Sequence, residues 1–231
     1  MQKNHKISLL LLCIIALLAV FVSTAMGSVP LPLMETVRML IGFESSNPTH
    51  NNIFYELRLP RVLAAFIVGG LLALAGVLMQ VLLKNPLADP YVMGISGGAA
   101  FGALIALYFN LGSEIGYLFA ASGALLSIIL VFLIAHGEGS WSASQLLLTG
   151  IVLAAGWGAL ISLLLAISPA KPLRSMMFWL MGDLSFAKHI GFASFVLLCV
   201  TCICFALARS LNVLAQNDTD AALLGLSLIH I

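Results

Sequence analysis

Uncharged apolar runs alternate along the chain with short polar stretches. A helix needs about 20 apolar residues to cross the hydrocarbon core of a bilayer. The runs that reach roughly this length predict six transmembrane helices, near residues 7–26, 62–83, 92–113, 115–135, 144–167 and 190–208. The pattern therefore predicts an all-α fold, a polytopic transmembrane helical bundle.

The first run allows a second interpretation. Lys3, His5 and Lys6 precede the apolar stretch and "STAMG" follows it, an arrangement that is also typical of a secretory signal peptide. The apolar core is long for a signal, and further spans follow it rather than a soluble domain. A retained first helix is the favoured interpretation.

The composition supports an integral membrane protein. Hydrophobic residues make up 61% of the chain, charged residues only 8%, and the mean hydropathy is +1.12. Ten Lys and Arg against nine Asp and Glu leave a net charge of +1, which gives no indication of a nucleic-acid partner. The four cysteines lie in apolar runs and are interpreted as packing residues; a thiol or metal site at Cys199 and Cys202 is the alternative.

The six predicted spans contain no Asp, Glu, Lys, Arg or His. Ion-coupled carriers need ionisable or ion-coordinating groups near mid-membrane, and membrane enzymes need acids, bases or metal ligands there. The chain also has no G-x-x-x-x-G-K-[ST] phosphate loop. We therefore expect no catalytic site, no bound metal and no cofactor in this chain, and an external energy source if it transports.

Small residues recur at four-residue spacing in several spans, as in Gly94, Gly98, Gly102 and Ala106. Such rows let helix backbones approach closely in lipid, where the hydrophobic effect cannot drive helix association. We expect these faces to pack on one another or on a partner. The positions singled out for close helix packing are Gly69, Gly76, Gly98 and Gly102.

The stretch "KNPLADPYVMGISGG" separates the second and third predicted spans. Asn85-Pro86 is a turn-forming pair, and Asp89 before Pro90 predicts a helix start with Asp as the N-cap and Pro at the first helical position. Taken alone, the stretch is a tight connecting loop.

A longer segment around this loop resembles a known family. The stretch from Arg58 to Leu107, "RLPRVLAAFIVGGLLALAGVLMQVLLKNPLADPYVMGISGGAAFGALIAL", is similar to the permeases of ATP-binding-cassette importers for iron complexes and vitamin B12, often called the FecCD family. "WSASQLLLTGIVL", "FWLMGDLS" and "LNVLAQNDTDAALLGL" resemble further family segments in the right order. The family motif covers Asn85, Pro86, Leu87, Ala88, Pro90 and Gly94.

The resemblance implies a type II importer permease in the bacterial inner membrane. It would translocate an iron-siderophore, haem or cobalamin-type complex into the cytoplasm, as a homodimer or as a heterodimer with a second permease. Two ATPase subunits would use the ATP, and a periplasmic or lipid-anchored substrate-binding protein would deliver the substrate.

The resemblance also implies roles for particular residues. Ala143 and Ser144 match the cytoplasmic gate, although the family's vitamin B12 permease has threonine where this chain has alanine. Residues 209–231 match the cytoplasmic segment that couples the permease to its ATPase. The matching positions there are Leu211, Asn212, Leu214, Asp218, Ala221, Leu224 and Gly225, whereas Gln216, Asn217 and Thr219 depart from the family pattern.

Arg58 and Arg61 stand directly in front of the second predicted span. Family topology places the amino terminus in the cytoplasm and residues 27–61 outside, so that more Lys and Arg lie outside than inside, against the usual bias. The family's Arg-x-Pro-Arg arginines pair with glutamates of the binding protein, which implies docking for both residues. Simple anchoring at the membrane interface is the alternative.

The family fold has about ten helices, and this chain ends within the coupling segment. We therefore expect residues 1–231 to form a single but incomplete permease domain with six spans of an expected ten. A truncated, non-transporting remnant is the second hypothesis. A secondary carrier is the third and is less favoured, because the spans offer no ionisable group for coupling.

Overall fold

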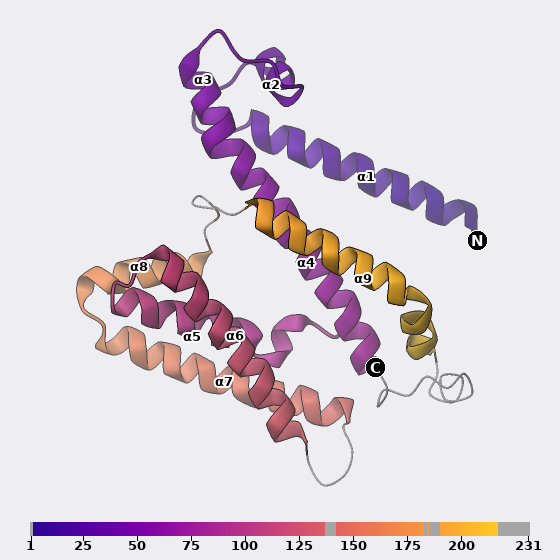
Figure 1. Ribbon diagram of the computed structural model, residues 1–231, viewed down its shortest axis with the longest axis vertical. Coiled ribbons are helices and arrows are strands. Elements are labelled where there is room, and N and C mark those ends of the chain that lie inside the picture. Colours follow the sequence, from indigo (N-terminus) through magenta and orange to yellow (C-terminus); the bar gives the residue numbers. More distant parts are fainter. Residues whose placement is uncertain (1, 137–141, 183, 185–189, 217–231) are drawn as a thin grey trace. The chain divides into compact units, whose positions relative to one another are not determined.

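The computed structural model describes residues 2–136, 142–182, 184 and 190–216 (Figure 1). Every regular element in this part of the chain is a helix, which confirms the all-α prediction. The elements are α1 (Gln2–Ala25), α2 (Leu33–Leu40), α3 (Pro48–Asn52), η1 (Ile53–Arg58), α4 (Leu59–Leu83), η2 (Pro90–Met93), α5 (Ile95–Tyr108), α6 (Ser113–Ala135), α7 (Ala143–Ile167), α8 (Ala170–Met181) and α9 (Ile190–Gln216).

Within the described residues, five helical stretches are long and apolar enough to cross a membrane. They match the first, second, fourth, fifth and sixth runs of the sequence pattern. Their bounds are Lys6–Ala25, Pro48–Leu83, Ser113–Ala135, Ala143–Ile167 and Ile190–Leu214. The second is longer than expected because α3, the π-helical η1 and α4 follow one another without a break.

A full-length third span at 92–113 is not confirmed. Its helix, α5, has 14 residues and is about 21 Å long, shorter than the hydrocarbon core. The backbone turns into the left-handed region at Gly94 (φ 68°) before α5 and at Asn110 (φ 54°) after it. Glycine and asparagine adopt this conformation at low cost, whereas the apolar pattern gives no sign of the reversal.

The chain divides into two compact units, which we describe separately. The first comprises residues 1–70 and 184–198. Residues 26–58, here called the α1–α4 connection, are folded within it around the buried side chains of Leu31, Met39 and Phe54. The Tyr55 hydroxyl donates a hydrogen bond of 2.9 Å to the Met39 carbonyl, which holds α2 against η1.

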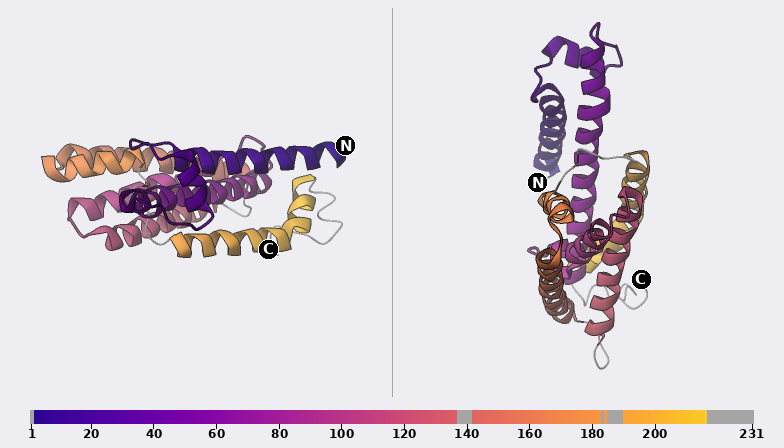
Figure 2. Two further views of the ribbon diagram at one scale, coloured as in Figure 1. Left: turned by 90° about the horizontal axis from the view of Figure 1, so that it is seen from above. Right: turned by 90° about the vertical axis from the view of Figure 1, so that its left-hand side faces the viewer.

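The second unit comprises residues 71–183 and 199–231, as far as they are described, and its centre is the short helix α5. Helices α6, α7 and α8 pack around α5 (Figures 1 and 2). A Cβ atom built at Gly98 would lie 2.4 Å from the carbonyl oxygen of Gly123, and one at Gly102 would lie 2.1 Å from that of Phe119. The backbones of α5 and α6 therefore touch directly along this line.

The other two glycines that the sequence suggested for close packing are placed differently. A Cβ atom at Gly69 or Gly76 of α4 would meet no described atom within 4 Å. Helix pairing at these two positions is therefore not found in the described part of the chain. It stays a prediction for a partner surface.

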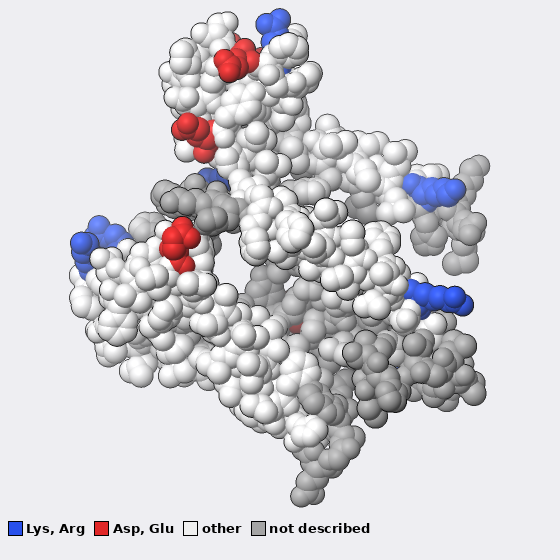
Figure 3. Space-filling model, viewed as in Figure 1, with Lys and Arg blue, Asp and Glu red and all other residues white. Residues whose placement is uncertain are grey.

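Charged side chains are sparse over the helices. In the face shown in Figure 3, Lys, Arg, Asp and Glu appear at a few separate places on a surface that is otherwise uncharged. Many large apolar side chains are exposed instead, such as Leu148, Ile151 and Val152 of α7. Such a surface suits contact with lipid or with other apolar helices.

We expect Gly123→Ala to destabilise the protein, because the new methyl group would meet the carbonyl oxygen of Gly98 at 2.1 Å. The expected loss is about 1–3 kcal/mol, the usual effect of overpacking. Gly116→Ala in the same helix is the matched control, since its Cβ would meet no described atom within 4 Å. Thermal melting of the purified protein in detergent measures both, and equal melting temperatures would contradict the packing.

Candidate functional site

The loop between α4 and α5 is built by local hydrogen bonds of the motif residues. The Leu87 amide donates 2.9 Å to Asn85 Oδ1, and the Ala88 amide donates 3.0 Å to the Asn85 carbonyl, which together form a tight turn. Asp89 Oδ1 accepts 2.7 Å from the Tyr91 amide, with Pro90 at the first helical position. The predicted cap is therefore present, although the helix it starts is the single 3₁₀ turn η2.

The end of this loop lies against α7 through two glycines. A Cβ atom at Gly94 would be 3.1 Å from the amide nitrogen of Ala154, and one at Gly150 would be 2.5 Å from the carbonyl oxygen of Val92. Both approaches involve backbone atoms, so neither position has room for a side chain. The loop and the first half of α7 are thus in direct backbone contact.

A buried polar contact joins three elements at the same place. Trp157 Nε1 of α7 donates a hydrogen bond of 3.1 Å to Ser127 Oγ of α6, and Ser127 Oγ donates one of 3.5 Å to the Met93 carbonyl of η2. All three residues are buried. The Trp157 ring also stacks near Phe101 of α5, with ring centroids 5.5 Å apart. The three residues Met93, Ser127 and Trp157 form what we call the buried polar contact.

The two residues predicted as the cytoplasmic gate begin α7. The Ser142 side chain caps this helix by accepting 3.1 Å from the Gln145 amide. Ala143 packs against a buried apolar cluster that includes Ala88 and Met93 of the loop, whereas Ser144 is exposed. The structure thus brings the predicted gate and the family motif together, although they are about 50 residues apart in the sequence.

The exposed part of the motif forms one wall of a groove of about 440 Å³. The opposite wall is the α4 face that carries Gly76 and Gln80. Leu87, which is 87% exposed, and Pro86 project from the loop there.

Part of the predicted coupling segment is the end of helix α9. Leu211 and Leu214 line an apolar groove of about 200 Å³ together with Leu78, Val81 and Leu82 of α4. Asn212 lies in the same helical turn and is exposed. The remaining predicted coupling residues, Asp218, Ala221, Leu224 and Gly225, lie outside the described residues.

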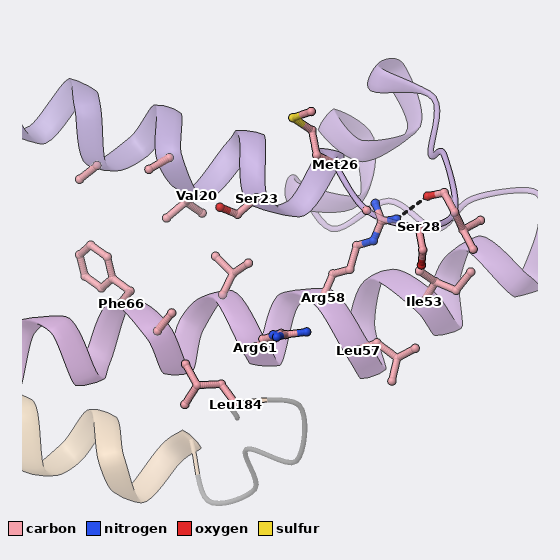
Figure 4. Close-up of a pocket in the computed structure, with 16 residues that line it drawn as sticks. Val20, Ser23, Met26, Ser28, Ile53, Leu57, Arg58, Arg61, Phe66 and Leu184 are labelled. Carbon is pink, nitrogen blue, oxygen red and sulfur yellow. Dashed lines mark hydrogen bonds between the residues drawn. The ribbon is translucent and has the colours of Figure 1, made fainter. Parts of the chain in front are cut away.

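Arg58 and Arg61, the two predicted docking residues, line a mostly apolar cleft between α1 and the start of α4 (Figure 4). The cleft measures about 810 Å³. The Arg58 guanidinium reaches α1, where its Nη1 donates 3.0 Å to the Thr24 carbonyl and 2.9 Å to the Ala25 carbonyl, and its Nη2 donates to the Val29 carbonyl. Arg61 is exposed and makes no hydrogen bond to a described residue.

A polar cluster orders the α1–α4 connection. Glu35 Oε2 accepts 2.9 Å from the Ser45 hydroxyl and lies 2.6 Å from His50 Nδ1. Asn51 bonds the Ser45 backbone twice, with its Oδ1 accepting from the amide and its Nδ2 donating to the carbonyl. The hydrogen bonds from His50 and Ser45 hold the pKa of Glu35 below its usual range.

Sequence reasoning missed the buried polar contact and the polar cluster. Trp157 stands in an uncharged apolar run, where its only signal is that a buried indole N–H usually has an acceptor. Nothing in the sequence pairs it with Ser127, 30 residues earlier. Likewise, the spacing of Glu35 and His50 matches no helix or strand period, so the sequence does not predict their contact. The contact depends on how the α1–α4 connection folds.

These features define a class of protein. The chain is a polytopic membrane protein with five apolar helical stretches long enough to cross a membrane in its described part, and its short helix α5 packs against α7. Comparison with known proteins gives the particular family: the chain belongs to the FecCD transport family, which it matches over residues 13–231.

Curated relatives agree with this assignment. The chain is 36% identical over 212 residues to the uncharacterized ABC transporter permease protein YvrB of Bacillus subtilis, covering 86% of this chain and 60% of the relative. It is 36% identical over 219 residues to the hemin transport system permease protein HmuU of Yersinia pestis, covering 91% and 65%. It is 35% identical over 188 residues to the molybdate import system permease protein MolB of Haemophilus influenzae, covering 79% and 55%.

A solved structure shows the same fold. It is an inward-facing conformation of a metal-chelate type ABC transporter, with a TM-score of 0.79 and 28% identity over 95% of this chain and 68% of the other. The chain spans about 55 to 65% of the length of these curated relatives. The names of the relatives include both hemin and molybdate, so family membership alone does not specify a substrate.

We expect Ser127→Ala to destabilise the protein by about 1–3 kcal/mol, because the buried Trp157 N–H would lose its acceptor. In a Trp157→Phe background no donor remains, so the same substitution should cost less. A double-mutant cycle of melting temperatures measures this coupling. Additive effects of the two substitutions would show that the contact contributes nothing.

We expect the Glu35 carboxyl to titrate below its ordinary pKa of 4.5, and His50→Ala to move the pKa back toward that value. Because the folded pKa is the lower one, the carboxylate stabilises the connection above about pH 4.5, and this contribution is lost as the pH falls through the folded pKa. Carbon-13 NMR of labelled glutamate side chains measures the titration. An unchanged pKa in His50→Ala would contradict the assigned cause.

Proposed function

We propose that this chain is part of the membrane permease of an ATP-binding-cassette importer. The observation that carries the proposal is the FecCD match over residues 13–231, together with the packing of the Asn85–Gly94 motif on the start of α7. The permease itself would have no ATPase site and would bind no cofactor. Two ATPase subunits would supply the energy from the cytoplasmic side.

The proposed cargo is a bulky metal complex of the iron-siderophore, haem or cobalamin type. Support comes from similar proteins, such as the hemin permease of Yersinia pestis and the vitamin B12 permease of Salmonella paratyphi A, and from the metal-chelate type of the similar structure. The uncharged spans also fit a wide, weakly interacting path better than a tight ion site.

In the proposed arrangement the amino terminus and the Asn85–Gly94 loop face the cytoplasm of a bacterium, and the α1–α4 connection faces outward. A second permease, identical or related, would pack on exposed apolar helix surfaces and enclose the path. Ala143 and Ser144 would form the inner gate. The end of α9 and the residues after it would contact the ATPase.

A substrate-binding protein would dock outside, on the α1–α4 connection. Arg58 and Arg61 are the proposed docking arginines, since arginine forks pair with carboxylates at interfaces. Both line the same cleft beside this connection.

We expect uptake into proteoliposomes to require ATP, the ATPase and the binding protein together. The protein would be reconstituted with the ATPase and binding protein of its own host, and uptake of haem and of cobalamin would be measured. Replacing the phosphate-loop lysine of the ATPase should reduce uptake to background. Uptake that runs on a proton or sodium gradient without ATP would contradict the proposal and favour a secondary carrier.

A further inference from the structure

One face of α7 lies against the Asn85–Gly94 loop, here called the motif loop, and against the start of α5. The residues of this face recur every three or four positions, which places them on one side of the helix. They are Ala143, Leu146, Gly150, Ala154 and Trp157. The gate residue Ala143 therefore stands at one end of the face, and the buried polar contact stands at the other, about 21 Å away along the helix axis.

Most contacts along this face are not directional. Ala143 and Leu146 belong to the apolar cluster shared with the loop, and Gly150 and Ala154 meet the loop by close backbone approach. Such contacts bring helices together in lipid, but apolar atoms there gain little from one apolar neighbour over another. They set the distance between α7 and the loop more than the position of α7 along its own axis.

The buried polar contact is directional. A hydrogen bond needs its donor and acceptor at a defined distance and angle. Trp157 Nε1 donates 3.1 Å to Ser127 Oγ, which in turn donates 3.5 Å to the Met93 carbonyl. Ser127 is fully buried, so neither bond can be exchanged for one to water. The three groups meet at one position of α7 relative to α6 and η2.

Ser127 bonds differently from other serines of these helices. A serine within a helix often donates back to a carbonyl of its own helix. Ser122 of α6 donates 2.9 Å to the Phe119 carbonyl, and Ser162 of α7 donates 2.9 Å to the Gly158 carbonyl. Ser127 instead bonds to two other elements. Its hydroxyl can do so because it both donates and accepts.

The backbone around the contact is shaped to receive it. The chain becomes left-handed at Gly94, so η2 ends at Met93 and α5 begins at Ile95. The Met93 carbonyl thus lies where the regular backbone pattern is interrupted, and a buried acceptor there needs another donor. A Cβ atom at Gly97 would lie 2.8 Å from the Cβ of Trp157, so the absence of a side chain at Gly97 leaves room for the indole.

We propose that Ser127 is a positioning residue that fixes α7 to the carboxyl end of the motif loop. Without the hydroxyl, α7 can slide along the loop. With it, the loop and the gate residues Ala143 and Ser144 move together when the permease changes state. The attachment does not depend on the proposed function, whereas the joint movement rests on it.

The attachment is tested by measuring the distance between two spin labels in the purified protein. The labels are placed on Tyr91→Cys in the loop and Leu148→Cys in α7, both exposed positions, after the four native cysteines are replaced by alanine. We expect one narrow distance in this parent. Ser127→Ala and Trp157→Phe should each add distances displaced by up to one helical turn, about 5 Å.

Gly102→Ala is the control for a loss of stability without loss of the contact. Its Cβ would lie 2.1 Å from the Phe119 carbonyl oxygen, so it should lower the melting temperature, but it stands about two helical turns after Gly94. The distance should stay narrow in this variant. Narrow distances in both Ser127→Ala and Trp157→Phe, or equal broadening in Gly102→Ala, would overturn the attachment. The use of two contact variants keeps the test valid if one of them does not fold.

The joint movement is tested by transport in proteoliposomes that also contain the ATPase and binding protein of the host. The quantity measured is the haem or cobalamin imported per ATP hydrolysed. We expect Ser127→Ala to lower this ratio at least about twofold while ATP hydrolysis continues, a change at the low end of measured coupling effects. Gly102→Ala should leave the ratio as in the parent, since a loss of stability alone removes active protein without changing the ratio.

Failure of this proposal and failure of the proposed function give different results. If the parent shows no ATP-dependent uptake, the proposed function fails and the joint movement with it, while the spin-label distances still decide the attachment. If the parent imports its cargo and Ser127→Ala does so at the same ratio, the joint movement is overturned even where the distances shift.

Discussion

The direct backbone contact between α5 and α6 is the constraint on which the second unit depends. In lipid, apolar side chains gain little by leaving hydrocarbon for a protein interior, so helices associate through close packing and interhelical hydrogen bonds. Gly98 and Gly123 place the two backbones against each other, since a Cβ atom on either would overlap a carbonyl oxygen. This approach brings Ser127 of α6 within reach of Met93 and Trp157.

The same packing attaches the motif loop to the helix that carries the proposed gate. The loop that carries the Asn85–Gly94 motif is fixed to α7 by glycine contacts, by a shared apolar cluster and by the buried polar contact. A movement of the start of α7, where the proposed gate lies, would therefore carry the loop with it. Packed interiors transmit displacement because they have little free volume to absorb it.

The α1–α4 connection follows a different principle, since it is rich in polar groups that bond to one another. Side-chain hydrogen bonds join α2 to α3 through Glu35, Ser45, His50 and Asn51. Arg58 donates hydrogen bonds to carbonyl groups at the end of α1. A helix end near a membrane surface leaves strong acceptors that need donors. Arg58, which the sequence suggested for contact with a partner protein, therefore also forms hydrogen bonds within its own chain.

The sequence by itself determined the helical class, the positions of five spans, the Asp89 cap and the family, because apolar run length, capping residues and motif spacing are local properties that a linear pattern records. Only the tertiary structure decided that the run at 92–113 contains a short helix and that Trp157 meets Ser127. It also decided that, among the described residues, Gly98 lies against a neighbouring helix while Gly69 does not. It alone also showed that Arg58 and Arg61, identical in type and three residues apart, have different surroundings. These outcomes depend on which distant segment lies opposite each residue, and the period of a helix specifies a face but not its neighbour.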